Sequence, residues 1–362
     1  MTDLRPRRLS ALADAVEAAH LDGLLVSGAA NVRYLSGFSG SSALMFVSSR
    51  ETLLITDFRY QTQAAEEVGD IARVVIEPQS LWSGLWQQLA QLAHVEVAGF
   101  ESAHLVHRDF QRLLEAGARY QWRPTVDLVE VLRERKDEDE LDRIRQAVAA
   151  AEHALALTIE QVKTGMTELE IAGVLESMLR QSGSDGFPFP SIVASGPNAA
   201  LPHARPTSRP LARGDLLLID FGARVGGYCS DVTRTFVVGK ASAEQKEVHD
   251  VVRLANERAV KAVKPGMSGR DADSVARGYI EDRGFGELFG HSLGHGIGLE
   301  VHEAPRLAKT SESPLVEGAV VTVEPGIYRP GWGGVRIEDD VHLGANGAQL
   351  LTRFARELIE IG

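Results

Sequence analysis

Four acidic residues occupy matching positions in two segments that alternate between apolar runs and glycine-rich turns. Asp220 and Asp231 lie in DLLLIDFGARVGGYCSDVTRTFVV. Glu324 and Glu338 lie in VVTVEPGIYRPGWGGVRIEDDVHL. Apolar and β-branched runs that are interrupted by glycine predict a strand, a tight turn and a second strand in each segment. We therefore expect two β-hairpins, each with one acid on either arm.

The register of each hairpin follows from the position of its turn. If the first hairpin turns between residues 225 and 226, Asp220 lies opposite Asp231. If the second turns at Gly331, Glu324 lies opposite Glu338. Directly opposed side chains point to the same face, with Cβ atoms about 5 Å apart. Two acids held this close repel each other and need a shared proton or a cation. Two such pairs with a nearby histidine predict a site for two divalent metal ions.

Length, charge and cysteine content limit the class of protein. At 362 residues the chain is long for one domain, so two are expected. The net charge of −12 argues against a nucleic acid or an anionic membrane as partner. The single cysteine, Cys229, cannot form an intrachain disulfide and fits a reducing compartment. Neither a signal peptide nor an apolar run of about 20 residues is visible, which predicts a cytoplasmic protein.

The first 128 residues are expected to form a small α/β domain. An amphipathic helix is predicted over residues 9–20, because apolar residues recur there at helical spacing. Helical stretches then alternate with five short apolar runs, which are GLLVS, ALMFVSS, TLLITD, ARVVIE and EVAGF. This alternation indicates a central sheet with helices against it. The segment RPTVDLVEVLRERKDEDE is interpreted as the exit from this domain, and a long helix is predicted from Leu141.

The remaining residues, 129–362, contain an internal repeat. VKTGMTELEIAGVLESML from Val162 resembles VKPGMSGRDADSVARGYI from Val263. Thr167 and Ser268 occupy equivalent positions and are each expected to cap the following helix, and Glu170 completes a capping box with Thr167. Each half is followed by one carboxylate hairpin. A duplicated unit with pseudo-twofold symmetry is therefore expected, with both hairpins facing one central site.

A histidine cluster precedes the second hairpin. His291, His295 and His302 lie in FGHSLGHGIGLEVHEAPRL, which is interpreted as a glycine-rich loop. Imidazole is the commonest neutral metal ligand. The GHGIG run lacks the strand–turn–helix unit of a dinucleotide-binding loop, and Arg306 stands where an HExxH zinc motif needs histidine. The cluster therefore supports a metal site more strongly than any one of its members.

The whole pattern resembles the pita-bread metallopeptidase family, and most closely its proline-specific aminopeptidases P and prolidases. The motifs that carry the resemblance are SDVTRTF, GHGIGLEVHE, TVEPGIY and GGVRIEDD. NVRYLSGFSG and ITDFRYQTQA are similar to the N-terminal domain of the same enzymes, so the resemblance covers the whole chain. It implies a creatinase-type α/β domain over residues 1–128. It also implies an α+β pita-bread catalytic domain with pseudo-twofold symmetry over residues 129–362.

The resemblance also implies a metal ligand set. Asp220 is expected to hold one metal ion, and Asp231 and Glu338 to bridge the two. His295 and Glu324 are expected to hold the other ion, with Glu324 also serving as general base. Ligation that is rich in oxygen with a single imidazole favours Mn²⁺, with Co²⁺ or Zn²⁺ as alternatives.

Further residues match positions on the substrate side of the site. His203 in LPHARPTS matches a histidine that lines the substrate, and His302 matches one that donates to the scissile carbonyl or its oxyanion. His291 matches the residue beside the proline pocket. Arg336 and Tyr328 match residues that support the metal-binding carboxylates.

The resemblance predicts a homodimeric exopeptidase with two metal ions, which cleaves the Xaa-Pro bond at the N-terminus of short proline-containing peptides. An aminopeptidase P is slightly preferred over an Xaa-Pro dipeptidase. Arg306 matches an arginine of some prolidases, whereas Thr310 stands roughly where others carry their carboxylate-binding arginine. More remote alternatives are a methionine aminopeptidase and a metal-free relative, either a hydrolase such as creatinase or a binding module of the histone-chaperone type.

Overall fold

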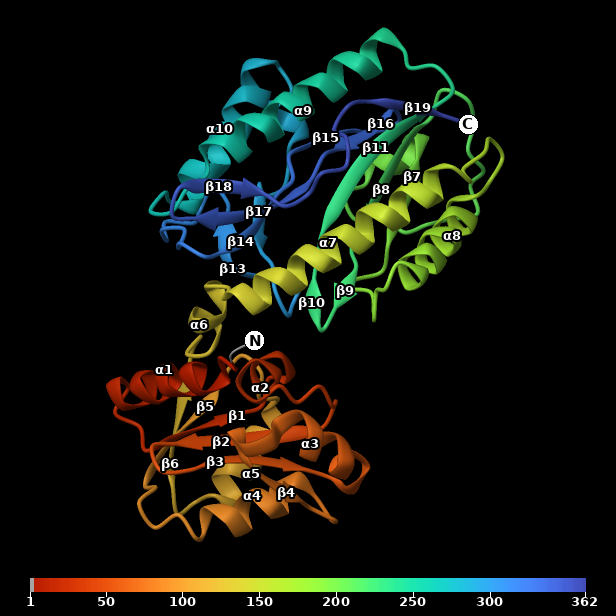
Figure 1. Cartoon of the computed structure of the whole chain (residues 1–362). Helices are drawn as coiled ribbons and strands as arrows, with labels where there is room; N and C mark the ends of the chain where they lie inside the picture. Colours follow the sequence, from red (N-terminus) through yellow and green to blue (C-terminus); the bar gives the residue numbers. More distant parts are fainter. Residues whose placement is uncertain (1–2) are drawn as a thin grey trace. The chain divides into compact units, whose positions relative to one another are not determined.

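The computed structural model describes residues 3–362 and divides the chain into two compact units (Figure 1). The division falls between Arg133 and Glu134. The domain boundary expected between residues 128 and 129 lies slightly earlier in the chain and stays a prediction. No helix within residues 3–362 is long and apolar enough to cross a membrane.

The N-terminal unit is built on one mixed sheet of six strands, in the order β4-β3-β2-β1-β5-β6. The strands are β1 (Gly23–Val26), β2 (Ala43–Ser48), β3 (Thr52–Thr56), β4 (Arg73–Ile76), β5 (Val97–Glu101) and β6 (Gln121–Thr125). Strands β1, β2 and β3 pair antiparallel, and β4, β5 and β6 add in parallel. The five strands expected from the sequence are confirmed. Strand β6 was missed, because this edge strand is largely exposed and contains Pro124, so it lacks the apolar signal of the others.

Helices accompany these strands as expected for an α/β domain. They are α1 (Arg5–Ala18), α2 (Ala29–Ser36), α3 (Gln61–Val68), α4 (Leu81–Leu89) and α5 (His107–Ala116), with 3-10 turns η1 (Phe58–Tyr60) and η2 (Gly69–Ile71). Helix α1 begins earlier than the expected residue 9, because Pro6 lies in its first turn, where no backbone N–H is needed. Leu85, Leu89 and Leu113 from α4 and α5 pack into one core with the strands.

The C-terminal unit contains two helix pairs and two larger sheets. Helix α6 (Glu130–Glu134) precedes α7 (Glu138–Ile159), α8 (Glu168–Gln181), α9 (Ala243–Ala262) and α10 (Gly269–Asp282). One sheet has the order β19-β11-β8-β7 and the other β13-β12-β14-β17-β18. The strands are β7 (Ile192–Ser195), β8 (Leu216–Phe221), β11 (Val232–Val238), β12 (Gly294–Gly296), β13 (Glu303–Leu307), β14 (Val320–Val323), β17 (Asp339–Gly344), β18 (Gly347–Leu350) and β19 (Ile359–Ile361).

Each sheet has its own helix pair and its own core. Helices α7 and α8 share one apolar core with β7, β8 and β11, and α9 and α10 share another with β14 and β17. Figure 1 shows the helix pairs on the outside and the strands between them. Every residue of β8 is buried, because the strand is covered on both sides. Asp220 is the only acid in this strand, and such a position requires a partner for its charge.

The internal repeat predicted from the sequence is confirmed by matching local contacts. The hydroxyl of Thr167 accepts the Glu170 N–H within a capping box, and the hydroxyl of Ser268 accepts the Asp271 N–H. The residues before the two capping residues also form equivalent backbone hydrogen bonds. The Met166 carbonyl accepts the Leu211 N–H at 2.8 Å, and the Met267 carbonyl accepts the Leu315 N–H at 2.8 Å. The two halves are thus built from the same helix–turn–helix unit.

Strand β11 connects the two halves of the C-terminal unit. The Glu338 N–H donates to the Thr233 carbonyl at 3.1 Å, so the second hairpin is hydrogen-bonded to a strand of the first half. Next to it, the buried guanidinium of Arg234 donates to Asp339 at 2.8 Å and to the Glu338 carbonyl at 2.6 Å. These contacts hold the strand that follows Asp231 against the strand that follows Glu338.

The second hairpin has the predicted register. Its turn joins β15 (Gly326–Arg329) to β16 (Gly333–Arg336), and the pairs Gly326↔Arg336 and Val323↔Asp339 share one register. In that register Glu324 is opposite Glu338, and Gly331 lies in the turn with a φ of 78°. The prediction succeeded because Gly331, whose positive φ favours glycine, marks the middle of the turn.

The first hairpin is shifted by two residues from the prediction. Its turn consists of Gly226 and Gly227, both with positive φ, between β9 (Arg224–Val225) and β10 (Tyr228–Cys229). Two adjacent residues with positive φ form a type I′ turn, the turn that fits a two-residue hairpin. Asp220 consequently pairs with Thr233 and not with Asp231. A shift of two residues leaves every side chain on its original face, so both aspartates still point toward the same side.

Cys229 lies in the short strand β10 and is 2% exposed. Its thiol contacts the Leu299 carbonyl at 3.8 Å. Burial raises the pKa of the thiol to about 12, so it stays protonated at neutral pH. This environment agrees with a packing role for the residue.

Glu168, the first residue of α8, is fully buried and is expected to be a major source of stability in the first half. Its carboxylate accepts hydrogen bonds from the backbone and hydroxyl of both Ser195 and Thr207 and from the Asn198 amide. Glu168→Gln replaces one carboxylate oxygen, which accepts hydrogen bonds, with an amide NH2 group, which donates them. This NH2 group would face the N–H and O–H groups that bonded the carboxylate. We expect the free energy of unfolding to fall by about 3 kcal/mol, measured by urea denaturation. Glu170→Gln on the exposed face of the same helix turn is the control and should cost less than about 1 kcal/mol.

Candidate metal centre and active site

The five predicted metal ligands converge from both halves of the C-terminal unit. Asp220 is on β8, and Asp231 directly precedes β11. His295 is on β12, whereas Glu324 follows β14 and Glu338 precedes β17. Because these strands meet across β11, acids that are more than 100 residues apart in the sequence reach one place. The expected glycine-rich loop around His295 is in part a strand, since β12 pairs with both β13 and β14.

Three of the five residues already have the geometry of a metal site. Ligand atoms of Asp231, His295 and Glu338 all lie within 4.8 Å of one another. The Nε2 atom of His295 lies 3.6 Å from a carboxylate oxygen of Glu324 and 3.7 Å from one of Asp231. The fifth residue, Asp220, instead forms a buried ion pair with Arg336 through one carboxylate oxygen.

Burial and mutual repulsion make this group of acids costly without a cation. Burial, followed by the nearby charges of Glu338 and Asp220, raises the pKa of Asp231 well above its usual range. Burial and the charge of Glu338 do the same for Glu324. Burial and the charge of Asp220 raise the pKa of Glu338 to about 8. The site therefore binds either protons or metal cations at neutral pH.

Individual oxygen atoms in the site lack partners. Within residues 3–362, Oδ1 of Asp220 and Oδ1 of Asp231 are buried and form no hydrogen bond. A buried carboxylate oxygen without a donor is costly, and a metal ion would relieve that cost. The donor set also suits hard divalent cations, since carboxylates dominate it. The residues present thus fit the metal site that the sequence predicts.

The ring of His295 is oriented for metal binding. Its Nδ1 lies 3.0 Å from the Gly296 carbonyl, and a hydrogen bond there places the proton on Nδ1 and the lone pair on Nε2. Burial lowers the pKa of His295 to about 4, so the ring is neutral at pH 7. A neutral ring with Nε2 directed at the acids is the form that ligates a metal.

Two buried threonines contact predicted metal ligands, one at a carboxylate and one at a backbone N–H, and the sequence analysis did not identify them. The Thr233 hydroxyl donates to Glu338 at 2.6 Å and accepts from the Arg336 Nε at 3.1 Å. In the other half, the Thr322 hydroxyl accepts the His295 N–H at 3.1 Å. The repeat offered a signal, since TRTF and TVEP place a threonine two residues from an acid in each hairpin.

Asp340 is another buried acid that the sequence analysis missed. Its Oδ2 accepts the Asp231 N–H at 3.1 Å, so it fixes the backbone of a predicted bridging ligand. Its own N–H donates to the Thr352 hydroxyl at 2.9 Å. Burial raises the pKa of Asp340 well above its usual range. The sequence signal was present in the EDD triplet, but only the first acid of that triplet was considered.

Arg336 and His291 belong to one hydrogen-bond network beside the acids. Arg336 donates to the Tyr328 hydroxyl at 2.6 Å, and that oxygen also lies 2.9 Å from the His291 Nε2. Burial and the positive charge of Arg336 lower the pKa of His291 to about 4. The other ring nitrogen of His291 lies 3.8 Å from Glu324. This network links Asp220 on one side of the site to Glu324 on the other.

His302 and His203 lie on the exposed side of the acids. The His302 ring packs edge-on against the His295 ring, with centroids 4.4 Å apart. Burial, then the positive charges of Arg306 and His203, lower the pKa of His302. His203 is exposed on the segment that follows η3 (Gly196–Ala200). Both side chains are therefore accessible to a substrate at the metal site.

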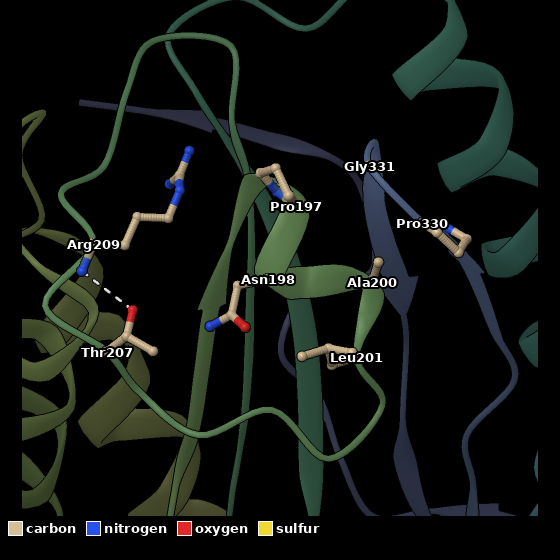
Figure 2. A pocket seen from close by; sticks show the side chains of 8 residues that line it. All are labelled: Pro197, Asn198, Ala200, Leu201, Thr207, Arg209, Pro330 and Gly331. Atoms are coloured by element: carbon tan, nitrogen blue, oxygen red, sulfur yellow. Dashed lines mark hydrogen bonds between the residues drawn. The ribbon is translucent and has the colours of Figure 1, made fainter.

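A cavity of about 490 Å³ lies beside the His203 segment and not at the acids (Figure 2). Figure 2 shows it between the segment of η3 and the turn of the second hairpin. Its lining includes Pro197, Ala200, Leu201, Arg209 and Pro330. None of the predicted metal ligands lines it. Arg209 is engaged there by Asp215 at 2.6 Å, so its charge is already compensated.

A second group of possible metal ligands occurs in the N-terminal unit. Ligand atoms of Glu101, His104 and Glu130 lie within 4.8 Å of one another. Here the oxygens already have donors, because Glu101 accepts the N–H groups of Ser27 and Gly28 at 2.6 and 2.7 Å. Glu130 lies 2.7 Å from the His104 Nε2. The group is therefore a satisfied hydrogen-bond network, unlike the acids of the C-terminal unit.

Comparison with known proteins places the chain in a family. Residues 142–345 match the model of metallopeptidase family M24, and residues 8–135 match the creatinase/prolidase N-terminal domain. The chain belongs to metallopeptidase family M24. M24 peptidases are hydrolases, and the fold predicted from the resemblance is confirmed, namely a creatinase-type N-terminal domain followed by a pita-bread catalytic domain.

Three relatives illustrate the similarity of this M24 chain to known proteins. An Xaa-Pro dipeptidase of Pyrococcus furiosus is 36% identical, over 97% of this chain and 99% of the relative. The structure of an Xaa-Pro dipeptidase from Bacillus anthracis has a TM-score of 0.95 and 38% identity, covering 99% of this chain and 100% of the other. An X-Pro aminopeptidase from Thermotoga maritima has a TM-score of 0.91 and 40% identity, covering 98% and 99%. Two of these three proteins are named Xaa-Pro dipeptidases and one an X-Pro aminopeptidase, so the comparison does not support the slight preference for an aminopeptidase P over a dipeptidase.

Asp231 is the ligand whose loss should be most damaging, since it lies within 4.8 Å of both His295 and Glu338. We expect Asp231→Ala to abolish tight Mn²⁺ binding in calorimetric titration and the metal-dependent rise in melting temperature. Asp250→Ala is the control, because Asp250 is an exposed residue of α9 whose ion pair within residues 3–362 is with Arg253. Unchanged Mn²⁺ binding by Asp231→Ala would overturn the assignment of this residue.

Thr233 offers a test of the support behind the ligands. Thr233→Val keeps the shape of the side chain but removes the hydrogen bonds to Glu338 and Arg336. We expect Mn²⁺ affinity to fall by about 10-fold or more, as for other residues that hold metal ligands. Thr158→Val removes an equally buried hydroxyl from α7, where it bonds only the Ala154 carbonyl, and should leave Mn²⁺ affinity unchanged.

Proposed function

We propose that this M24 peptidase is an Xaa-Pro dipeptidase that holds two divalent metal ions. Two of the three relatives described above are named Xaa-Pro dipeptidases and cover almost the whole chain. The structural observation that carries the proposal is an exposed arginine, Arg306, on the face of the sheet that bears His295. A dipeptidase must bind a C-terminal carboxylate one residue beyond the scissile bond, and a guanidinium is well suited to this task.

The position of Arg306 follows from strand pairing. In the β12–β13 register, His295 is directly opposite Arg306, so both side chains point to the same face. Within residues 3–362 its exposed guanidinium forms no hydrogen bond or ion pair. Its charge contributes to the lowered pKa of His302, which supports its location near the substrate side of the site. An exposed cation at this point is available to a substrate carboxylate.

The metal ions would be held by the five residues that the sequence predicts. When bound, two divalent ions supply Lewis acidity toward the scissile carbonyl and lower the pKa of a water molecule. Asp231 and Glu338 would be shared between the ions, which is supported by their ligand atoms lying within 4.8 Å of each other and of a ring nitrogen of His295. Asp220 would need to share its charge between an ion and Arg336.

The protein side chains would position the substrate and transfer protons. Glu324 is the proposed general base, because its carboxylate lies beside both His295 and His291 and carries a raised pKa. His302 is proposed to donate to the carbonyl oxygen, a contribution of about 3 kcal/mol for single donors of this kind. His203 is proposed to line the substrate side of the site. An Xaa-Pro bond has no N–H, so recognition of proline depends on shape, for which His291 and Tyr328 offer a wall.

Three further expectations accompany this proposal. Mn²⁺ is the preferred ion, with Co²⁺ or Zn²⁺ as alternatives, because carboxylates outnumber imidazoles among the ligands. A homodimer and a cytoplasmic location stay predictions from the resemblance and the sequence.

The proposal is tested with Mn²⁺-loaded protein and equal concentrations of Ala-Pro and Ala-Pro-Ala, with release of free alanine as the readout. A dipeptidase should cleave Ala-Pro preferentially. Arg306→Ala should then raise the KM for Ala-Pro by about 10-fold or more, because a charge-assisted contact to the carboxylate is lost. Lys309→Ala, which removes an exposed cation three residues further on, should leave KM unchanged.

The alternative is an X-Pro aminopeptidase, which the 40% identical Thermotoga maritima relative favours. Preferential cleavage of Ala-Pro-Ala, with no effect of Arg306→Ala on KM, would establish that activity. If Mn²⁺ binds but neither peptide is cleaved, proline specificity is refuted for this member of the M24 family.

A further inference from the structure

A buried ion pair lies directly beside the predicted substrate-binding His302. The Lys136 Nζ is 3.0 Å from an oxygen of Glu303, and the two side chains are only 1% and 6% exposed. Removing two charges from water costs free energy, and the attraction between the buried charges often does not compensate for this cost. Replacing a buried ion pair with an apolar pair of similar volume is often neutral or stabilising. The location of the pair therefore suggests a role other than stability.

The lysine belongs to a rigid part of the catalytic unit. Lys136 lies between α6 and α7, and its N–H donates to the Gly318 carbonyl at 2.9 Å. The next residue, Asp137, caps α7 and forms a capping box with Glu140. The backbone of Lys136 is thus fixed on both sides, and its ammonium is a stationary anchor for Glu303.

The glutamate closes the turn that leads to His302. Glu303 is the first residue of β13, and its second carboxylate oxygen accepts the Glu300 N–H at 3.0 Å. The Gly298 N–H donates to the Glu300 carbonyl at 3.0 Å, which tightens the same turn. A Cβ atom added at Gly298 would lie 2.6 Å from a Glu303 carboxylate oxygen, so the carboxylate packs directly on the glycine.

The turn over residues 297–303 follows β12, which contains His295, and has His302 near its end. Its first residue, Ile297, is hydrogen-bonded to Val320 at 3.0 Å, so the beginning of the turn is fixed to β14. His302 itself is exposed and is held in place by its edge-on contact with the His295 ring. At the end of the turn, next to His302, Glu303 pairs with Gly296 in the β12–β13 ladder, and its carboxylate adds the side-chain contact with the Glu300 N–H.

We propose that Lys136 and Glu303 are positioning residues, which hold the turn over residues 297–303 so that His302 meets the scissile carbonyl. This inference rests on the proposed function, in which His302 donates to that carbonyl. The contact that matters is the hydrogen bond from the Glu300 N–H to Glu303, with Lys136 as its support. A displacement of about 1 Å in a catalytic group can reduce turnover about 100-fold.

Two double variants separate positioning from stability. Lys136→Met with Glu303→Gln removes both charges but keeps an acceptor for the Glu300 N–H. Lys136→Met with Glu303→Leu removes both charges and the acceptor. Neither leaves a buried unpaired charge, so we expect similar melting temperatures.

The two double variants should differ in turnover. We expect the leucine variant to lose kcat by about 10-fold or more, with KM within about twofold and Mn²⁺ affinity unchanged, and the glutamine variant to retain most of its kcat. Equal kcat values for the two variants would overturn the proposal, because the glutamine variant keeps an acceptor for the Glu300 N–H and the leucine variant does not.

A second measurement does not depend on activity. Hydrogen–deuterium exchange of the peptide that covers residues 297–303 should be faster in the leucine variant than in the glutamine variant. Arg209→Met, which breaks the ion pair to Asp215 elsewhere in the unit, is the control and should leave exchange of this peptide unchanged. Unchanged exchange in the leucine variant would refute the proposal even if the wild-type protein cleaves neither proline peptide.

Gly298→Ala provides the same test if the leucine variant does not fold. The added methyl group displaces the Glu303 carboxylate without changing any charge. We expect a comparable loss of kcat and faster exchange of residues 297–303. A folded Gly298→Ala protein with wild-type turnover and exchange would overturn the proposal.

Discussion

Repulsion among buried acids is the constraint on which the rest of the catalytic unit depends. Asp231, Glu324 and Glu338 carry raised pKa values because they share one water-poor space. The buried guanidinium of Arg336 forms an ion pair with Asp220, and that of Arg234 forms one with Asp339. The fold must therefore hold these carboxylates close together although their charges repel each other. It does so with backbone bonds between the halves, of which the bond from Glu338 to Thr233 lies at the centre. A cation bound among these carboxylates would reduce the repulsion, so metal binding is expected to stabilise this unit.

The repeat explains how such an arrangement can be built. Each half contributes a capped helix pair, a sheet and one hairpin with two acids, and each hairpin adds a threonine that holds a ligand. Two similar halves that meet across β11 bring their acids together without a long connecting segment. Packing of the helices in the two apolar cores stabilises each half. The polar side chains at the strand ends can therefore form the site.

Local sequence signals predicted the candidate site residues better than they predicted the short strands and the distant hydrogen-bond partners around them. The second hairpin register followed from one glycine, and the shifted register of the first preserved the face of both aspartates because side chains alternate with a period of two. The short strand β12 was hidden by its glycines, and β6 by its exposed residues and proline. Asp340 could not be assigned, because its partner, the Asp231 N–H, is 109 residues away in the sequence. The same holds for Lys136 and Glu303, which are 167 residues apart.

Burial of the single cysteine has a practical consequence. The Cys229 thiol is 2% exposed, and its pKa is raised to about 12, so thiol-specific reagents meet almost no reactive thiolate in the folded protein. The native cysteine therefore does not need to be removed before a label is attached elsewhere. A cysteine introduced at any exposed position would be the only site to react with a fluorophore or spin label. Distances and motions within this peptidase can therefore be followed spectroscopically without first altering its own sequence.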